Sequence, residues 1–244
     1  MHLKNLTIAL AGNPNAGKTT IFNSLTGTRQ KVGNWPGVTV EKKEGTIVRD
    51  GYHINLVDLP GTYSLTPFST EEIIARNYIL DNTPDVVIAI IDASNLERSL
   101  YLATQLRELD CRVVFALNMA DLARSRGIKI DTDKLSELLD LPVVFTVGNK
   151  QEGLDLLIKA AIELAECRTV AAQKRRVRYN QEIERSIEAV RALLVDALGD
   201  TLRYSPRWTA IKLIEDDQIV KEHLANMTQA QFKALSDEIG RAHV

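Results

Sequence analysis

The segment from residue 12 to residue 19 constrains the fold of this chain more than any other. Its letters, GNPNAGKT, fit the pattern GxxxxGK[ST]. The apolar run 6–11 before it predicts a buried strand, and the stretch 18–25 after it predicts a helix. A glycine-containing turn between the two lets consecutive backbone N–H groups point at phosphate oxygens beside a helix N-terminus. The segment therefore predicts a phosphate-binding loop in an α/β fold.

The side chains of this loop have separate expected roles. Lys18 reaches the β- and γ-phosphates of a nucleotide, and the Thr19 hydroxyl ligates Mg²⁺. The residues expected to contact the nucleotide here are Gly12, Asn13, Asn15, Ala16, Gly17, Lys18, Thr19 and Thr20. For the motif by itself, the alternative is a glycine-containing turn that binds nothing.

Short apolar runs alternate with amphipathic stretches as far as residue 167, which is typical of βα units. The run 86–91 predicts a central parallel strand, and Asp50-Gly51 predicts a two-residue hairpin turn. Residues 28–41 lack periodicity and predict a long functional loop. We expect a P-loop α/β fold with a mostly parallel sheet of six strands and one antiparallel edge hairpin.

The pattern changes near residue 168, after which apolar residues recur every three or four positions. This predicts a small all-α domain over 168–244, following an α/β domain over 1–167. Its helices are expected to end at Gly199, to restart at Ser205-Pro206, and to continue as two segments, 216–225 and 228–240.

Charge and composition exclude several classes of protein. Lys and Arg number 30 against 32 Asp and Glu, so the basic excess of a nucleic-acid binder is missing. The two cysteines and four histidines are not spaced as metal ligands, so we expect no iron to bind to this chain itself. No apolar run approaches the roughly 20 residues that span a bilayer, and we expect a cytoplasmic location.

A second phosphate-sensing segment, Asp58-Leu59-Pro60-Gly61, follows a predicted strand. Asp58 can hold Mg²⁺ through water, and the Gly61 N–H can contact the γ-phosphate. Thr39, within the long loop, is the candidate for closing over Mg²⁺ and the γ-phosphate. Lys18, Thr39, Gly61 and Asn15 are the expected catalytic residues.

A base-recognition segment, Asn118-Met119-Ala120-Asp121, follows the predicted strand 113–117. The Asp121 carboxylate can accept both N–H donors of guanine, whereas adenine would present an acceptor to it. The segment Thr146-Val147-Gly148 follows the last predicted strand, where a backbone N–H can reach the guanine O6. The alternative for Asp121 is an ordinary helix N-cap.

The order of these motifs resembles that of small GTPases, and longer matches resemble the FeoB family of prokaryotic ferrous-iron transporters. The matching segments are GNPNAGKT at 12–19, VGNWPGVTVE at 32–41, DLPGTYS at 58–64 and DASNLER at 92–98. The resemblance implies a cytosolic GTP-binding domain at the inner face of the membrane. It also implies a helical domain that modulates nucleotide release, a membrane permease domain as partner and a homo-oligomer as a further option.

The same resemblance implies a potassium ion at Asn15, because an asparagine at this position ligates K⁺ in related potassium-activated GTPases. Such a cation would supply the charge that an arginine finger supplies elsewhere. An asparagine selected for turn geometry is the alternative.

Two departures from the GTPase pattern leave other functions open. Thr62 stands where many small GTPases have a water-orienting glutamine, so we expect slow hydrolysis, or none in a GTP/GDP sensor. Met119 replaces the usual lysine and can pack on the base. A ribosome- or RNA-associated GTPase is the other alternative. The position of Trp35, anchored or near the nucleotide, is left open.

Overall fold

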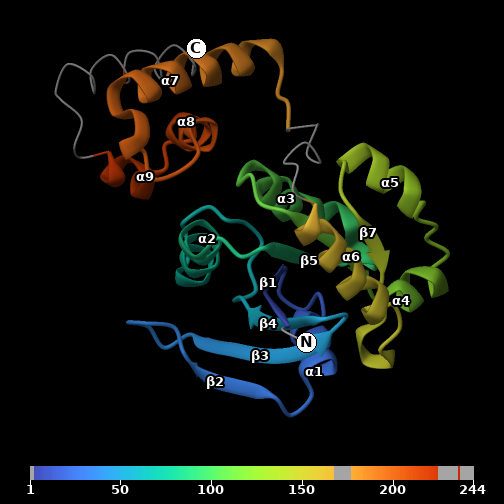
Figure 1. Cartoon of the computed structure of the whole chain (residues 1–244). Helices are drawn as coiled ribbons and strands as arrows, with labels where there is room; N and C mark the ends of the chain where they lie inside the picture. Colours follow the sequence, from blue (N-terminus) through green and yellow to red (C-terminus); the bar gives the residue numbers. More distant parts are fainter. Residues whose placement is uncertain (1–2, 168–176, 225–235, 237–244) are drawn as a thin grey trace. The chain divides into compact units, whose positions relative to one another are not determined.

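A computed structural model describes residues 3–167, 177–224 and 236 of the chain. It divides into two compact units, the first comprising Met1–Arg107 and Cys111–Arg176, and the second Glu108–Asp110 and Val177–Val244. The first unit carries the β-sheet, and the described part of the second is helical (Figure 1).

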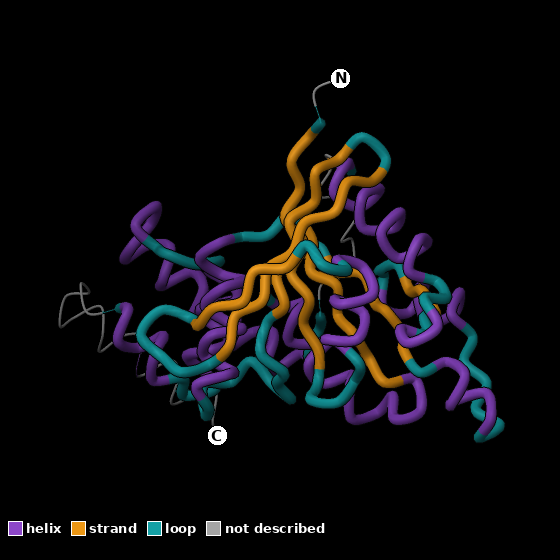
Figure 2. Tube along the Cα trace, turned by 90° about the horizontal axis from the view of Figure 1, so that it is seen from below, coloured by secondary structure: helices purple, strands orange, loops and turns teal. Residues whose placement is uncertain are grey.

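The sheet of the first unit has seven strands in the order β2-β3-β4-β1-β5-β6-β7. The five strands from β4 to β7 in this order are parallel, whereas β3 is antiparallel to β4 and β2 to β3. All seven strands belong to one continuous twisted sheet (Figure 2). The strands are β1 (Lys4–Gly12), β2 (Gln30–Asn34), β3 (Glu41–Arg49), β4 (Tyr52–Asp58), β5 (Val86–Asp92), β6 (Val113–Asn118) and β7 (Val143–Phe145). The predicted fold class is confirmed, but the expected count of six strands is wrong by one.

The additional strand is β2, which lies in the segment 28–41 that was expected to be a loop. It pairs with β3 from Gln30 opposite Gly45 to Asn34 opposite Glu41. After Gln30 its side chains are exposed, so the strand has no buried face to impose an alternation of apolar and polar residues. Backbone pairing at a sheet edge leaves no such signal in the sequence.

The predicted hairpin turn is confirmed between β3 and β4. Asp50 and Gly51 have φ values of 47° and 80°, the left-handed backbone that a two-residue turn of this kind requires. Asparagine, aspartate and glycine tolerate this region best, which explains the signal in the sequence.

One face of the sheet packs against helices α1 (Lys18–Thr26) and α6 (Leu154–Glu166). Alternate residues of β1, such as Ile8 and Leu10, join this core and are fully buried. Because Ala9 between them is buried as well, β1 is covered on both faces. This explains why the central strands appear in the sequence as continuous apolar runs.

The first unit has four other helices in its described part. They are α2 (Thr70–Asn82), α3 (Leu96–Glu108), α4 (Ala120–Ser125) and α5 (Thr132–Leu139), with short 3₁₀ turns η1 (Ala93–Asn95) and η2 (Gly148–Lys150). At the start of α2, Ser69 Oγ accepts from Glu72 N at 3.2 Å, and Glu72 Oε2 accepts from Ser69 N at 3.0 Å. This capping box satisfies two N–H groups of the helix terminus.

The second unit contains α7 (Gln181–Leu198), η4 (Gly199–Thr201), α8 (Pro206–Ile214) and α9 (Gln218–His223). The helix end near Gly199 and the restart at Pro206 agree with expectation. The predicted helix 228–240 falls outside the described residues, apart from residue 236. The buried apolar residues of the second unit include Ile187, Val190, Leu194, Trp208, Ile211 and Val220.

Two polar clusters accompany this small core. Arg207 donates to both carboxylate oxygens of Glu184, at 2.9 and 2.8 Å, which lowers the pKa of that carboxyl. Burial raises the pKa of Glu108, which accepts from the Tyr179 hydroxyl. The ammonium of buried Lys212 lies 3.8 Å from Glu108 and 2.6 Å from Glu215.

Across the described part of the chain, no helix combines the length and the apolar character needed to cross a bilayer.

Candidate nucleotide-binding site

The turn between β1 and α1 is built around two glycines that no larger residue could replace. A Cβ on Gly12 would lie 2.6 Å from the backbone oxygen of Ile90 on the neighbouring strand β5. Gly17 has a φ of 86°, and a Cβ there would lie 2.2 Å from the amide nitrogen of Asn118. The geometry therefore requires glycine at both ends of the loop, as the motif predicts.

Lys18, Thr19 and Asp58 meet at the carboxyl ends of β1 and β4. The Lys18 ammonium donates to Asp58 Oδ1, and the Thr19 hydroxyl donates to Oδ2 at 3.2 Å. The side chains of Lys18 and Asp58 are 9% and 6% exposed, so their ion pair is shielded from water. Two segments 40 residues apart in the sequence thus bring a cation, a hydroxyl and a carboxylate to one point.

The segment after Asp58 lies directly against the phosphate loop. The Thr62 N–H donates to the carbonyl of Gly12 at 3.1 Å, and Thr62 is buried. A Cβ on Gly61 would come within 3.3 Å of Pro14, which shows how closely the two loops approach. Because its N–H is already engaged and its side chain is buried, Thr62 does not present the reach of a glutamine at this position.

Helix α3 supports both loops with contacts that the motifs did not identify. Asn13 Nδ2 donates to Ser99 Oγ at 3.4 Å. Gln105 accepts from the Leu65 N–H at 2.7 Å and lies within 3.2 Å of the Thr66 hydroxyl. These polar residues are interior positions of a helix, where no local sequence signal separates a loop anchor from an ordinary surface residue.

Arg98, also on α3, stacks over the ring of Tyr63 with 4.1 Å between its guanidinium carbon and the ring centroid. Tyr63 follows Thr62 in the loop, so this contact holds the loop from its exposed side.

A cavity of about 540 Å³ opens over the phosphate loop, and exposed Asn15 lies at it with a φ of 65°. The lining residues are Asn13, Pro14, Asn15, Gly17, Lys18, Thr19, Thr20, Gly61 and Met119. The cavity therefore combines residues from three of the predicted motifs.

Thr39 and Trp35 lie on the connection between β2 and β3. Thr39 is exposed, whereas Trp35 is 7% exposed and packs edge-on against Tyr78 of α2, with 5.4 Å between ring centroids. Lys42 Nζ lies 5.0 Å from the centroid of the Trp35 ring. Trp35 is thus an anchor of this segment against the protein, which resolves the alternative left open by the sequence.

Asn118 joins the phosphate loop to the base-recognition segments. Its amide nitrogen donates to the carbonyl of Ala16 at 2.9 Å, and its amide oxygen accepts from the Gly148 N–H at 3.0 Å. The Thr146 hydroxyl lies 3.4 Å from the same oxygen. Asn118 is 3% exposed, so it acts as a buried cross-link between three segments.

The segment 146–148 makes specific backbone contacts. The N–H groups of Thr146 and Val147 donate to the carbonyls of Leu117 and Glu152, at 2.9 and 3.1 Å. The Gly148 N–H is the one directed at a side chain, that of Asn118. The N–H groups of all three residues expected near the guanine O6 are therefore hydrogen-bonded within the protein.

Asp121 lies at the start of α4, after Met119 in a left-handed conformation with a φ of 59°. Its Oδ1 accepts from the Leu122 N–H at 2.9 Å, and its Oδ2 accepts from Lys150 Nζ at 2.8 Å. The hydrogen bond from Lys150 lowers the pKa of the Asp121 carboxyl, and the same contact raises the pKa of Lys150. Lys150 lies outside every motif in the sequence and was not anticipated.

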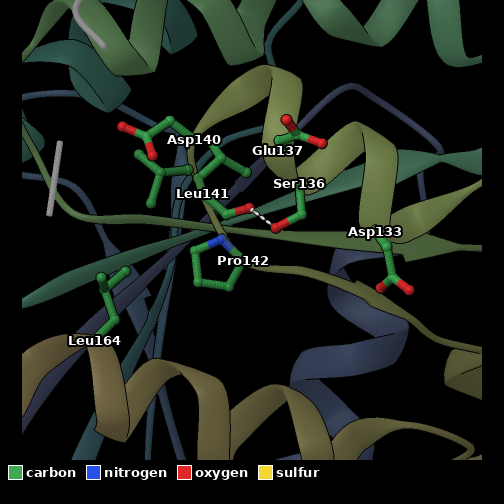
Figure 3. Close-up of a pocket in the computed structure, with 8 residues that line it drawn as sticks. Asp133, Ser136, Glu137, Asp140, Leu141, Pro142 and Leu164 are labelled. Atoms are coloured by element: carbon green, nitrogen blue, oxygen red, sulfur yellow. Dashed lines mark hydrogen bonds between the residues drawn. The ribbon is translucent and has the colours of Figure 1, made fainter. Parts of the chain in front are cut away.

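A second hollow is lined by residues of α5, the turn between α5 and β7, the start of β6 and α6 (Figure 3). Asp133, Glu137 and Asp140 border it, and the Ser136 hydroxyl donates to the carbonyl of Leu141 at 2.6 Å. Its acidic rim would repel phosphate.

The strand order, the phosphate loop and the separate base-recognition segments define the G-domain class of P-loop nucleotide-binding proteins. The family model "Ferrous iron transport protein B" matches residues 6–161, and the model "FeoB cytosolic helical domain" matches residues 179–243. The chain belongs to the FeoB family. The helical match favours this family over the RNA-associated alternative.

Known relatives agree with this assignment. The Fe(2+) transporter FeoB of Salmonella typhimurium is 44% identical over 97% of this chain. The Fe(2+) transport protein A/Fe(2+) transporter FeoB fusion protein of Porphyromonas gingivalis is 40% identical over 93%. The chain spans only 31% and 27% of the lengths of these two relatives.

Solved structures are similar over nearly the whole chain. A variant of the S. thermophilus FeoB domain bound to mGDP has a TM-score of 0.87 at 41% identity, covering 98% of this chain and 90% of that one. The cytosolic domain of T. maritima FeoB in apo form has a TM-score of 0.84 at 40% identity, covering 98% and 94%.

Proposed function

We propose that this chain is a Mg²⁺-dependent GTPase switch that regulates a ferrous-iron permease in the same full-length protein. The observation that carries the proposal is the convergence of Lys18 and Thr19 on Asp58, beside a loop whose glycines permit close approach of phosphate. GDP-bound structures of similar proteins support the nucleotide as ligand.

The residues present suit a magnesium ion. The Thr19 hydroxyl and the Asp58 carboxylate are hard oxygen donors only 3.2 Å apart. When bound, Mg²⁺ would neutralise charge on the β- and γ-phosphate oxygens. Lys18 would exchange its partner Asp58 for phosphate oxygens, which leaves Asp58 free to hold the metal through water.

The proposed switch depends on two segments. Thr39, exposed between β2 and β3, would close toward the γ-phosphate, and the Gly61 N–H would bind it. In base recognition, Asp121 would accept the guanine donors, and Met119 would pack on the base. A backbone N–H of the segment 146–148 would bind O6 only after leaving its present acceptor, which for the Gly148 N–H is Asn118 Oδ1. Buried Thr62 supports slow intrinsic turnover, and a non-hydrolysing sensor is the second candidate for the same reason.

We also propose that Asn15 holds a K⁺ ion beside the phosphates. GTP turnover with Mg²⁺ is then faster in KCl than in NaCl at equal ionic strength, by about tenfold or more, because the cation offsets transition-state charge. ATP is not turned over. The measurement is phosphate release, and binding without any release would favour the sensor.

Asn15→Gly tests the cation site directly. Glycine tolerates the φ of 65° at this position but removes the amide oxygen, so the turn is kept and the ligand is lost. The variant is expected to bind GDP normally and to lose the difference between KCl and NaCl. Full K⁺ stimulation in this variant would contradict the assignment.

The helical domain over residues 168–244 is proposed to modulate nucleotide release and to transmit the switch to the permease. A chain truncated after residue 167 is expected to release GDP at a rate changed by about fivefold or more, the size of a typical coupling between sites. Stopped-flow fluorescence of a labelled GDP measures the rate. Equal rates in both chains would contradict the coupling.

A further inference from the structure

The base-recognition carboxylate of this chain has a cationic partner of its own. Lys150 Nζ donates to Asp121 Oδ2 at 2.8 Å, while Oδ1 accepts from the Leu122 N–H. Their side chains are 52% and 36% exposed, so the pair lies at the surface where a base can approach it. Met119, which stands in the position of the usual lysine, contributes no charge.

The turn that carries Lys150 is held in place. The Ser24 hydroxyl of α1 donates to the carbonyl of Gly148 at 2.9 Å, and Val147 and Glu152 form a β-bridge across the turn. The Lys150 N–H donates to the carbonyl of Val147 at 3.0 Å. A Cβ on Gly153 would lie 2.1 Å from the oxygen of Phe145, so the chain passes very close to the end of β7 there. Lys150 therefore starts from a fixed backbone position near Asp121.

Guanine and the Lys150 ammonium need the same acceptor. The N1–H and 2-amino groups of guanine are donors that approach the two carboxylate oxygens as a pair. An ammonium on Oδ2 occupies one of these acceptors, and its positive charge repels the donor edge of the base. Nearby Glu152 and Arg124 also face Lys150, and their charges act on it in opposite directions.

We propose that Lys150 competes with guanine for Asp121 and thereby speeds nucleotide release. The inference rests on the proposed recognition of guanine by Asp121. When GDP leaves, Lys150 recaptures the carboxylate and opposes rebinding. Lys150 is thus a residue that tunes affinity and guanine selectivity.

The test compares Lys150→Gln with wild type in the full chain, using GDP, IDP and ADP as competitors of a fluorescent GDP. K150Q is expected to bind GDP about two- to fivefold more tightly, the range set by a solvent-exposed ion pair, mainly through slower dissociation. The gain is smaller for IDP, which lacks the 2-amino donor, and absent for ADP. Raising the salt concentration reduces the difference, since salt screens the pair in wild type.

Matched variants separate this effect from others. K150R keeps the cation and is expected to behave as wild type. K159Q removes an equivalent charge from an exposed position on α6, paired with Glu163 at 3.9 Å, and is expected to leave GDP binding unchanged. In the Asp121→Asn background, K150Q is expected to have no further effect on GDP binding.

Each other outcome has a definite meaning. Unchanged or weaker GDP binding by K150Q, or an equal gain for ADP, would overturn the competition. If Asp121→Asn loses the preference for guanine while K150Q equals wild type, only the role of Lys150 is wrong. If Asp121→Asn keeps full guanine preference, the proposed base recognition is wrong, and the inference about Lys150 falls with it.

Discussion

Replacing Lys18 by methionine is expected to lower the rate of GTP hydrolysis by about 10²–10³, as the loss of a preorganised cation at a transition state does. The side chain lies at the start of α1 beside the phosphate loop, where it can follow the developing charge on the γ-phosphate. Methionine keeps the unbranched length and removes the charge. Phosphate release under single-turnover conditions measures the effect.

The same variant also tests the buried ion pair. Without the Lys18 ammonium, Asp58 is left as a buried carboxylate, which costs about 3–5 kcal/mol of unfolding free energy. Adding Asp58→Asn is expected to restore most of this stability, measured by urea unfolding, but not hydrolysis. Lys159→Met, an exposed control, is expected to change neither property. Hydrolysis by K18M within about tenfold of wild type would contradict the assigned role.

Asn118→Ala is expected to lower the unfolding free energy by about 2–4 kcal/mol, because it leaves two buried backbone groups without partners. These are the carbonyl of Ala16 and the N–H of Gly148, which Asn118 binds at 2.9 and 3.0 Å. The phosphate loop and the base-recognition segments then lose their cross-link. GDP affinity is therefore expected to fall by about 10²-fold or more, measured by calorimetric titration.

Asn82→Ala provides the matched control, since Asn82 is exposed at the end of α2. It is expected to change the unfolding free energy by less than about 0.5 kcal/mol and to leave GDP affinity unaltered. An Asn118→Ala variant that is as stable as this control would show that the three segments are held by other contacts.

Elements with a buried face could be predicted from the sequence. The strand β5 is a continuous apolar run, and α7 places Ile187, Val190 and Leu194 on one buried stripe. The hairpin turn at Asp50-Gly51 could also be predicted, because these two residue types favour the left-handed backbone found there. In contrast, β2 and α4 could not be predicted, because an exposed edge strand and a helix of six residues carry too little hydrophobic pattern.

The motifs alone predicted the phosphate loop, since glycine at positions 12 and 17 and lysine at 18 are local requirements of such a loop. Only the tertiary structure decided which side chains elsewhere in the chain contact these motif segments. The Gln105 side chain accepts from the backbone N–H of Leu65, 40 residues away in the sequence, and the Lys150 side chain donates to that of Asp121, 29 residues away. Such contacts depend on how strands and helices pack, and a single polar residue on a helix or turn gives no sign of the partner that packing brings to it.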